Sequence, residues 1–222
     1  MKIIETGDGS HSLLNESLSE TYHSVHGAVQ ESVYVFIKNG LLDFIQKNKP
    51  KEISVLEIGF GTGLNALLAL KESVEQKTKI YYTSIEASPI GEEIYSQLNY
   101  AKHIIRADAD RLFKQLHSSP WNLPISVAEN FVLKKIQSKI QEIVLPPSAF
   151  DIVFFDAFAP AKQPEMWELP VLTKVVLSLK PKGEFVTYCA QGQLKRNLKS
   201  LGLIVETLPG PPGKREMVRA LK

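Results

Sequence analysis

The chain has 222 residues, 44% of them hydrophobic, and its 26 basic and 24 acidic side chains leave a net charge of +2. This length and apolar content suit one α/β domain and exclude a disordered chain, while the balanced charge neither requires nor excludes a nucleic-acid partner. The single cysteine, Cys189, excludes an internal disulfide, and the five histidines lack metal-binding spacing, so we expect no metal site.

No apolar run approaches the ~20 residues of a membrane span, so we expect no membrane association. The opening MKIIETGDGS lacks the basic and apolar regions of a signal peptide. Both observations predict a cytoplasmic protein.

The first predicted element in chain order is a helix. Residues 29–47, VQESVYVFIKNGLLDFIQK, have helical periodicity, and Lys49 and Pro50 interrupt the pattern. We therefore expect residues 1–50 to form an N-terminal helical segment or lid. This lid would fold over the ligand-binding edge of a domain formed by residues 51–222.

Short apolar runs of β-type composition follow, and they alternate with helical stretches. Helices are predicted at residues 63–74 and 193–202, with a helical insertion at about residues 90–125. Such alternation implies right-handed βαβ crossovers and a mostly parallel sheet with helices on both faces. The predicted strands are residues 53–59, 79–87, 130–136, 150–157, 183–190 and 202–208, with residues 215–222 as a seventh.

The first of these strands leads directly into a glycine-rich turn, VLEIGFGTGLN. Gly59, Gly61 and Gly63 would let the backbone pass close to a ligand at the N-terminus of the next helix. The spacing is G-x-G-x-G rather than the G-x-G-x-x-G of a dinucleotide site, because Leu64 takes the sixth position. With Glu57 before it, this spacing resembles motif I of the S-adenosylmethionine-dependent methyltransferases.

The fourth strand, FDIVFFDA, ends in an acid that an apolar sheet centre does not need. Asp156 follows the carboxyl end of the strand, where parallel α/β sheets bind ligands, and Pro160 and Pro164 keep the next loop irregular. We expect Asp156 to face the transferred methyl group and to accept a hydrogen bond from a target amine. An aspartate of ordinary pKa is a poor base for an alkylammonium of pKa ~10, so this role is positioning rather than proton abstraction.

The block DAFAPAKQPEMW, together with GFGTGLN, GAVQESVYVF and GKREM, resembles the methyltransferase domain of the bifunctional tRNA 5-methylaminomethyl-2-thiouridine biosynthesis proteins. The resemblance covers about residues 20–222. It implies a Rossmann-like class I S-adenosylmethionine-dependent methyltransferase with a mostly parallel seven-stranded sheet. It also implies S-adenosylmethionine as cofactor, tRNA as partner, and methylation of the exocyclic amine of 5-aminomethyl-(2-thio)uridine at the wobble position.

The FAD-dependent oxidase half of those bifunctional proteins has no counterpart in these 222 residues. We therefore expect a stand-alone methylating module. Another protein would then supply the aminomethyl precursor.

Two positions depart from that family's pattern. Its E-S-x-H-V-F segment has a histidine where this chain has Tyr34, and its acid after the third strand is replaced here by Gln137 and Ser138. We expect this amide and hydroxyl to hold the adenine; Asp108 is an alternative by spacing, although it also suits a helix N-cap. Glu86 ends the second strand, where a carboxylate can accept both ribose hydroxyls. The residues expected to hold the cofactor are Glu57, Gly59, Phe60, Gly61, Gly63, Asn65, Glu86, Gln137, Ser138 and Asp156.

Phosphate contacts from lysine and arginine should supply most of the affinity for tRNA. Two basic clusters are candidates, at residues 195–199 and at residues 214–219, and we favour the second because its loop should lie beside the fourth-strand loop. Paired or solvated side chains are the alternative interpretation. The residues expected to contact the substrate are Ala157, Pro160, Lys162, Lys214 and Arg215.

Two other functions stay open. The chain could methylate another amine, on a small molecule or a protein, or it could be a non-catalytic nucleotide-binding protein of the same fold. An intact Asp156 beside an intact glycine motif argues against the second. The DAFAPAKQPEMW and GKREM blocks argue against the first, by resemblance alone.

Overall fold

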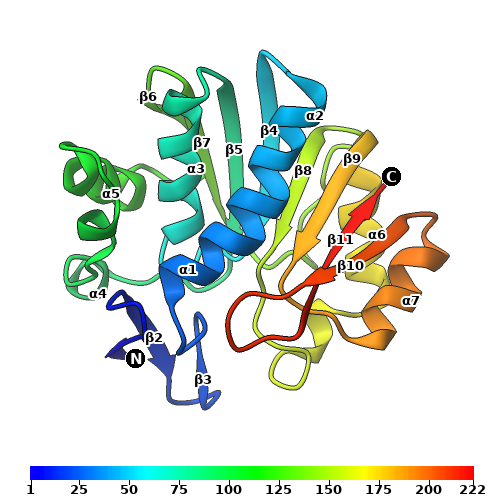
Figure 1. The fold of residues 1–222 in the computed structure, drawn as a ribbon, viewed down its shortest axis with the longest axis horizontal. Helices are drawn as coiled ribbons and strands as arrows, with labels where there is room; N and C mark the ends of the chain where they lie inside the picture. The colour runs from blue at the N-terminus through cyan, green and yellow to red at the C-terminus, as the bar shows by residue number, and fades with distance from the viewer.

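The computed structural model describes all 222 residues and contains an eight-stranded sheet, covered by helices on both faces, with a small sheet beside it (Figure 1). The strand order is β10-β11-β9-β8-β4-β5-β7-β6. Strands β7, β5, β4, β8 and β9 run parallel, and β11 inserts antiparallel between β9 and β10. The strands are β4 (Glu52–Ile58), β5 (Lys79–Glu86), β6 (Pro124–Ala128), β7 (Phe131–Gln137), β8 (Phe150–Phe155), β9 (Leu179–Thr187), β10 (Ile204–Pro209) and β11 (Glu216–Leu221).

The predicted α/β fold is confirmed, and all seven predicted strands are present. The eighth strand, β6, pairs antiparallel with β7 and was not predicted. Its five residues bury only Val127, so it lacks the apolar run that marked the other strands. The region before it, predicted as a helical insertion, contains the short helices α4 (Glu92–Tyr95), η2 (Tyr100–His103) and α5 (Ala109–Ser118).

Side-chain alternation along the central strands divides the core into two clusters of 33 and 22 buried residues. On one face Val55 and Phe154 pack with the N-terminal helix, α3 (Leu64–Glu75) and α5. On the other face Leu56 and Phe155 pack with α6 (Leu169–Ser178) and α7 (Gly192–Ser200). Strands buried on both faces explain the continuous apolar runs in the sequence.

The helix predicted at residues 29–47 is present and continuous, although three segments compose it: α1 (Ala28–Ser32), η1 (Val33–Leu42) and α2 (Asp43–Asn48). The middle segment is π-helical. A Cβ on Gly40 would lie 3.2 Å from the ring of Phe154, so the helix approaches the sheet closely there. Lys49 ends the helix in the left-handed conformation (φ 46°), directly before Pro50.

The first 21 residues are not helical, contrary to the expectation for residues 1–50. They form the antiparallel strands β1 (Lys2–Glu5), β2 (His11–Asn15) and β3 (Glu20–Thr21). The loop TGDGS between β1 and β2 instead caps the long helix, whose N-cap residue, Gly27, has no side chain. Three side chains accept its first free N–H groups: Thr6 from Ala28 (3.1 Å), Ser10 from Val29 (3.2 Å) and Asp8 from Gln30 (2.9 Å).

This capping ties the small sheet to the helix, because unsatisfied N–H groups at a helix start favour oxygen acceptors and negative charge. Hydrogen bonds from Ser10 and Gln30 lower the pKa of Asp8 against the opposing effect of its burial. None of the helices combines the length and hydropathy that a membrane span requires.

Candidate active site

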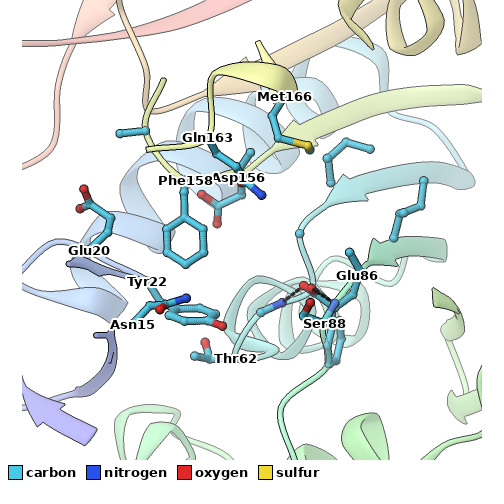
Figure 2. Close-up of a pocket in the computed structure, with 18 of the residues that line it drawn as sticks. Asn15, Glu20, Tyr22, Thr62, Glu86, Ser88, Asp156, Phe158, Gln163 and Met166 are labelled. Carbon is cyan, nitrogen blue, oxygen red and sulfur yellow. Dashed lines mark hydrogen bonds between the residues drawn. The ribbon is translucent and has the colours of Figure 1, made fainter. Parts of the chain in front are cut away.

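A cavity of about 740 Å³ opens at the carboxyl ends of β4, β5, β7 and β8 (Figure 2). Its walls come from the glycine turn after β4, from Glu86 and Ser88 after β5, and from the loop after β8. The small N-terminal sheet supplies a further wall through residues such as Asn15 and Glu20, and the segment after β7 supplies another. The cavity therefore lies where the sequence predicted a ligand site.

The glycine turn brings the backbone of β4 against that of β8. Gly59, Gly61 and Gly63 all have positive φ, at 93°, 51° and 74°. A Cβ on Gly59 would lie 2.6 Å from the carbonyl oxygen of Asp156, which is closer than real Cβ contacts allow. Only glycine fits there, and the two chain segments that line the cavity meet at that point.

The carboxylate of Glu86 is held by the backbone. Its Oε2 accepts the N–H of Gly61 at 2.9 Å, and its Oε1 accepts the N–H of Ser88 at 2.8 Å (Figure 2). Each carboxylate oxygen can accept a second hydrogen bond. Glu86 therefore presents a fixed pair of acceptors to the cavity, a geometry that suits a vicinal diol.

Asp156 is also held in place. Its Oδ2 accepts a hydrogen bond from Asn65 Nδ2 at 2.8 Å, and its backbone N–H donates to Ile58 at 3.0 Å. Burial, and then the negative charge of Glu31, raise the pKa of Asp156 to about 7, while Asn65 and Lys214 act in the opposite direction. The ordinary pKa assumed from the sequence is therefore wrong, and this carboxyl is a stronger base than expected.

An ion pair that the sequence did not predict lies in the same cavity. Glu31, from the N-terminal helix, is buried and accepts hydrogen bonds from Lys214 Nζ and from the backbone of Ser24. The Lys214 ammonium also lies 3.7 Å from the ring centroid of Tyr188, whose hydroxyl donates to the Ala157 carbonyl at 2.8 Å. The pair joins residues 183 positions apart, so only the fold brings it together.

Residues 112–222 match a sequence family described as S-adenosyl-L-methionine-dependent methyltransferase. The chain belongs to that family. The predicted family resemblance and the expected cofactor, S-adenosylmethionine, are thereby confirmed. Among solved structures, MNMC2 from Aquifex aeolicus superposes on this methyltransferase with a TM-score of 0.81 and 28% sequence identity, covering 99% of this chain and 69% of that one.

Curated relatives are longer. The methyltransferase is 30% identical over 220 residues to the tRNA 5-methylaminomethyl-2-thiouridine biosynthesis bifunctional protein MnmC of Idiomarina loihiensis, and 30% identical over 215 residues to that of Leptospira interrogans. Each alignment covers 92% of this chain but only 36% and 33% of those proteins. The chain thus spans about a third of the length of these relatives.

The structure brings most of the predicted site residues of the methyltransferase together. Nine line the cavity: Gly59, Phe60, Gly61, Asn65, Glu86, Ser138, Asp156, Ala157 and Lys214.

The other predicted residues lie outside it. Gly63, the last glycine of the turn, is the N-cap residue of α3. Gln137 is exposed at the end of β7, and Pro160 borders a neighbouring groove with Trp167. Lys162 and Arg215 make no ion pair, and neither lines the cavity.

Glu57, predicted to hold the cofactor, is a residue of β4 between the neighbouring strands β5 and β8, and it is fully buried and does not line the cavity. Its Oε2 accepts a hydrogen bond from Ser84 at 2.6 Å. Side chains alternate between sheet faces along a strand, and this one faces the core rather than the ligand edge. Asp108 starts α5 and pairs with Arg106 and Arg111, so it does not reach the adenine side either.

Two of the three cations in the predicted basic cluster at residues 214–219 form ion pairs within the protein. Lys214 is paired with Glu31 inside the cavity, and Arg219 is buried against Asp43 and Glu206. Only Arg215 of the three cations is exposed. Carboxylates distant in sequence supply these partners, so the spacing of the cluster gave no sign of them.

Three aromatic side chains of the cavity were not predicted, those of Tyr22, Phe158 and Tyr188. Tyr22, after β3, meets Phe158 of the β8 loop edge to face, with ring centroids 5.0 Å apart (Figure 2). Burial, and then the charge of Glu86, raise the pKa of Tyr22 to about 12, so its hydroxyl stays neutral. Tyr34, which replaces the family histidine, lies outside the cavity.

Proposed function

We propose that this methyltransferase methylates the exocyclic amine of 5-aminomethyl-(2-thio)uridine at the tRNA wobble position. The carrying observation is Asp156, a carboxylate fixed by Asn65 and by the backbone at the cavity wall. Such an acceptor can aim an amine nitrogen toward a methyl donor. The relatives named for tRNA 5-methylaminomethyl-2-thiouridine biosynthesis support this choice of amine.

We assign the cofactor to the half of the cavity between the glycine turn and the end of β5. The residues fit it: Gly59 and Gly61 allow close backbone approach, and Glu86 offers two fixed acceptors for ribose hydroxyls. Ser138 lies after β7 on the adenine side, where its N–H donates to the Glu86 carbonyl at 3.0 Å. S-adenosylmethionine supplies a methyl group that is already activated on a sulfonium.

The protein's own task is then to orient a neutral amine. Asp156 accepts one N–H of the amine and directs the nitrogen lone pair toward the methyl group, an effect of proximity and orientation. With its pKa near 7, Asp156 is ionised in about half of the molecules at neutral pH. Glu31 is a second carboxylate in the cavity, where it pairs with Lys214.

The same proposal gives residues 1–50 the role of a lid over a methyltransferase domain formed by residues 51–222. Asn15, Glu20 and Tyr22 all line the cavity from the small sheet. The TGDGS loop fixes that sheet to the long helix. A tRNA substrate would place the reaction in the cytoplasm, with another protein supplying the aminomethyl group.

The function is tested by incubating the protein with S-adenosylmethionine and tRNA that carries 5-aminomethyl-uridine at the wobble position. Nucleoside mass spectrometry should find methylaminomethyl-uridine in that tRNA and none in tRNA with an unmodified wobble uridine. Methylation of a free amine or of a protein, without any methylated nucleoside in the tRNA, would contradict the proposal. Cofactor turnover without any acceptor serves as the blank.

We infer that exposed cations beside the cavity hold the tRNA phosphates. Helix α7 borders the β8 loop through the groove that contains Pro160 and Gln191, and on it Arg196 and Lys199 have no acidic partner. Arg215 is exposed in the loop before β11. Lys214 was predicted to contact a tRNA phosphate, but we do not include it here because it already pairs with Glu31.

Replacing Arg196 and Lys199 with alanine should weaken tRNA binding. The slope of log affinity against log salt should become shallower by about one unit for each lost contact. Filter binding at several salt concentrations measures this slope, with calorimetry to check that S-adenosylmethionine affinity is unchanged. Lys114→Ala on α5, where Asp110 pairs with that lysine, is the matched control; an unchanged slope in the double variant would move the tRNA surface elsewhere.

A further inference from the structure

Buried polar side chains lie behind the cavity wall, beneath Asn65. Glu57 of β4 is fully buried, and its neighbours across the sheet are Ser84 of β5 and Phe154 of β8. Ser84 donates to Glu57 Oε2, whereas Glu57 Oε1 has no hydrogen-bond partner. A buried carboxylate oxygen that lacks a donor is strongly unfavourable, so a donor or a proton is missing at this atom.

Asn65 has the matching deficiency. Its Nδ2 donates to Asp156, so its Oδ1 is turned away from Asp156, and this oxygen is buried without a partner. Asn65 and Tyr82 both lie within hydrogen-bonding reach of Glu57, and the Tyr82 hydroxyl is also buried without a partner. If Glu57 were ionised, two hydrogen-bond acceptors, Glu57 Oε1 and Asn65 Oδ1, would face each other with no hydrogen between them.

We propose that Glu57 is protonated in the folded enzyme and donates its carboxyl proton to Asn65 Oδ1, which makes Glu57 a positioning residue for Asp156. One proton satisfies both unpaired oxygens. It also fixes the Asn65 amide in the orientation that directs its NH2 group to Asp156. That bond favours the ionised form of Asp156, which is the form that accepts a hydrogen bond from the amine.

The surroundings of Glu57 agree with a neutral carboxyl group. The groups that face it are the hydroxyls of Ser84 and Tyr82, the amide of Asn65 and the carboxyl of Asp156, and none is a cation. Burial raises the pKa of Glu57 to about 8, with a smaller contribution from Asp156, against hydrogen bonds that act the other way. An ionised Glu57 would instead attract the Asn65 NH2 group and leave Asp156 without its donor.

Glu57→Gln and Glu57→Met test the proposal as a pair. Glutamine can donate through Nε2 to Asn65 and accept from Ser84, as the protonated acid does, whereas methionine has similar bulk and no donor. We expect Glu57→Gln to keep kcat within about threefold and Glu57→Met to lower it about 10- to 100-fold, with S-adenosylmethionine affinity little changed in both. In Glu57→Met the acid limb of the pH profile should also move to higher pH, because Asp156 loses its donor.

If Glu57→Gln is as slow as Glu57→Met, the enzyme requires an ionised carboxylate and the proposal is wrong. If Glu57→Met is as fast as the wild type, Glu57 does not position Asp156 and the proposal is also wrong. The inference rests on the role proposed for Asp156, so a second measurement uses no substrate. The infrared difference between wild type and Glu57→Gln at neutral pH should contain the C=O band of a protonated carboxyl group. Ser84→Ala should shift that band, since Ser84 binds the carbonyl oxygen. Absence of the band overturns the inference and leaves the tRNA proposal untouched.

Discussion

Asp156→Ala should lower kcat for aminomethyl-uridine tRNA by about 100-fold or more, because the amine loses the acceptor that orients it. Affinity for S-adenosylmethionine should stay within several-fold of wild type, since Glu86 and the glycine turn are intact. This division between kcat and binding is the signature of lost positioning. Single-turnover kinetics together with calorimetry measure both quantities.

Asp156→Asn is the matched control, because it keeps the shape of the side chain and removes its charge. In the wild type, kcat/KM should rise with pH through about 7, as Asp156 loses its proton and becomes an acceptor. That limb should be absent in Asp156→Asn, while any rise due to deprotonation of the amine itself remains. An Asp156→Ala enzyme with near wild-type turnover would show that the amine is held by other groups, with Glu31 the first to examine.

Gly59→Ala should weaken S-adenosylmethionine binding by about 10- to 100-fold, or about 1.4–2.8 kcal/mol. The added Cβ would lie 2.6 Å from the Asp156 carbonyl oxygen, and this contact is with backbone, which cannot swing aside as a flexible side chain can. The glycine turn and the β8 loop must therefore separate. Calorimetry measures the affinity, and circular dichroism verifies that the variant is folded.

Gly202→Ala separates this collision from backbone strain. Gly202 has nearly the same positive φ, 87° against 93° for Gly59, and a Cβ there meets nothing within 4 Å. We expect it to cost about 1 kcal/mol of stability through its left-handed conformation and to leave cofactor binding unchanged. Equal losses of affinity in both variants would mean that strain alone, rather than the contact with Asp156, explains the effect of Gly59→Ala.

The predicted site residues that the structure places at the cavity are those carried by local pattern. Gly59 and Asp156 directly follow the apolar strands β4 and β8, Gly61 lies two residues after Gly59, and Glu86 is the last residue of β5. The carboxyl ends of these parallel strands meet at one edge of the sheet. The order of strands and loops along the chain is therefore enough to place these residues together. Glu57 shows the limit of this reasoning, since motif position placed it near the ligand and strand alternation turned it into the core.

The residues missed by sequence owe their place to contacts over long separations. Glu31 and Lys214 pair across 183 positions, and Tyr22 reaches Phe158 from a small sheet whose short strands carry little apolar pattern. The free N–H groups at the start of the long helix are accepted by side chains of the TGDGS loop rather than by the N-cap residue. None of these partners has a fixed spacing in the chain, so no motif could predict them.

By itself, the sequence determined the α/β class, the strand order along the chain, the glycine turn and the acid after the fourth strand, because these depend on periodicity and on backbone conformations that few residues adopt. Tertiary structure alone decided the protonation of the site and the identity of its remaining walls. Burial and neighbouring charge raise the pKa of Asp156 to about 7 and that of Glu57 to about 8. Hydration and charge around a carboxyl group depend on which segments pack against it, and that information exists only once the chain has folded.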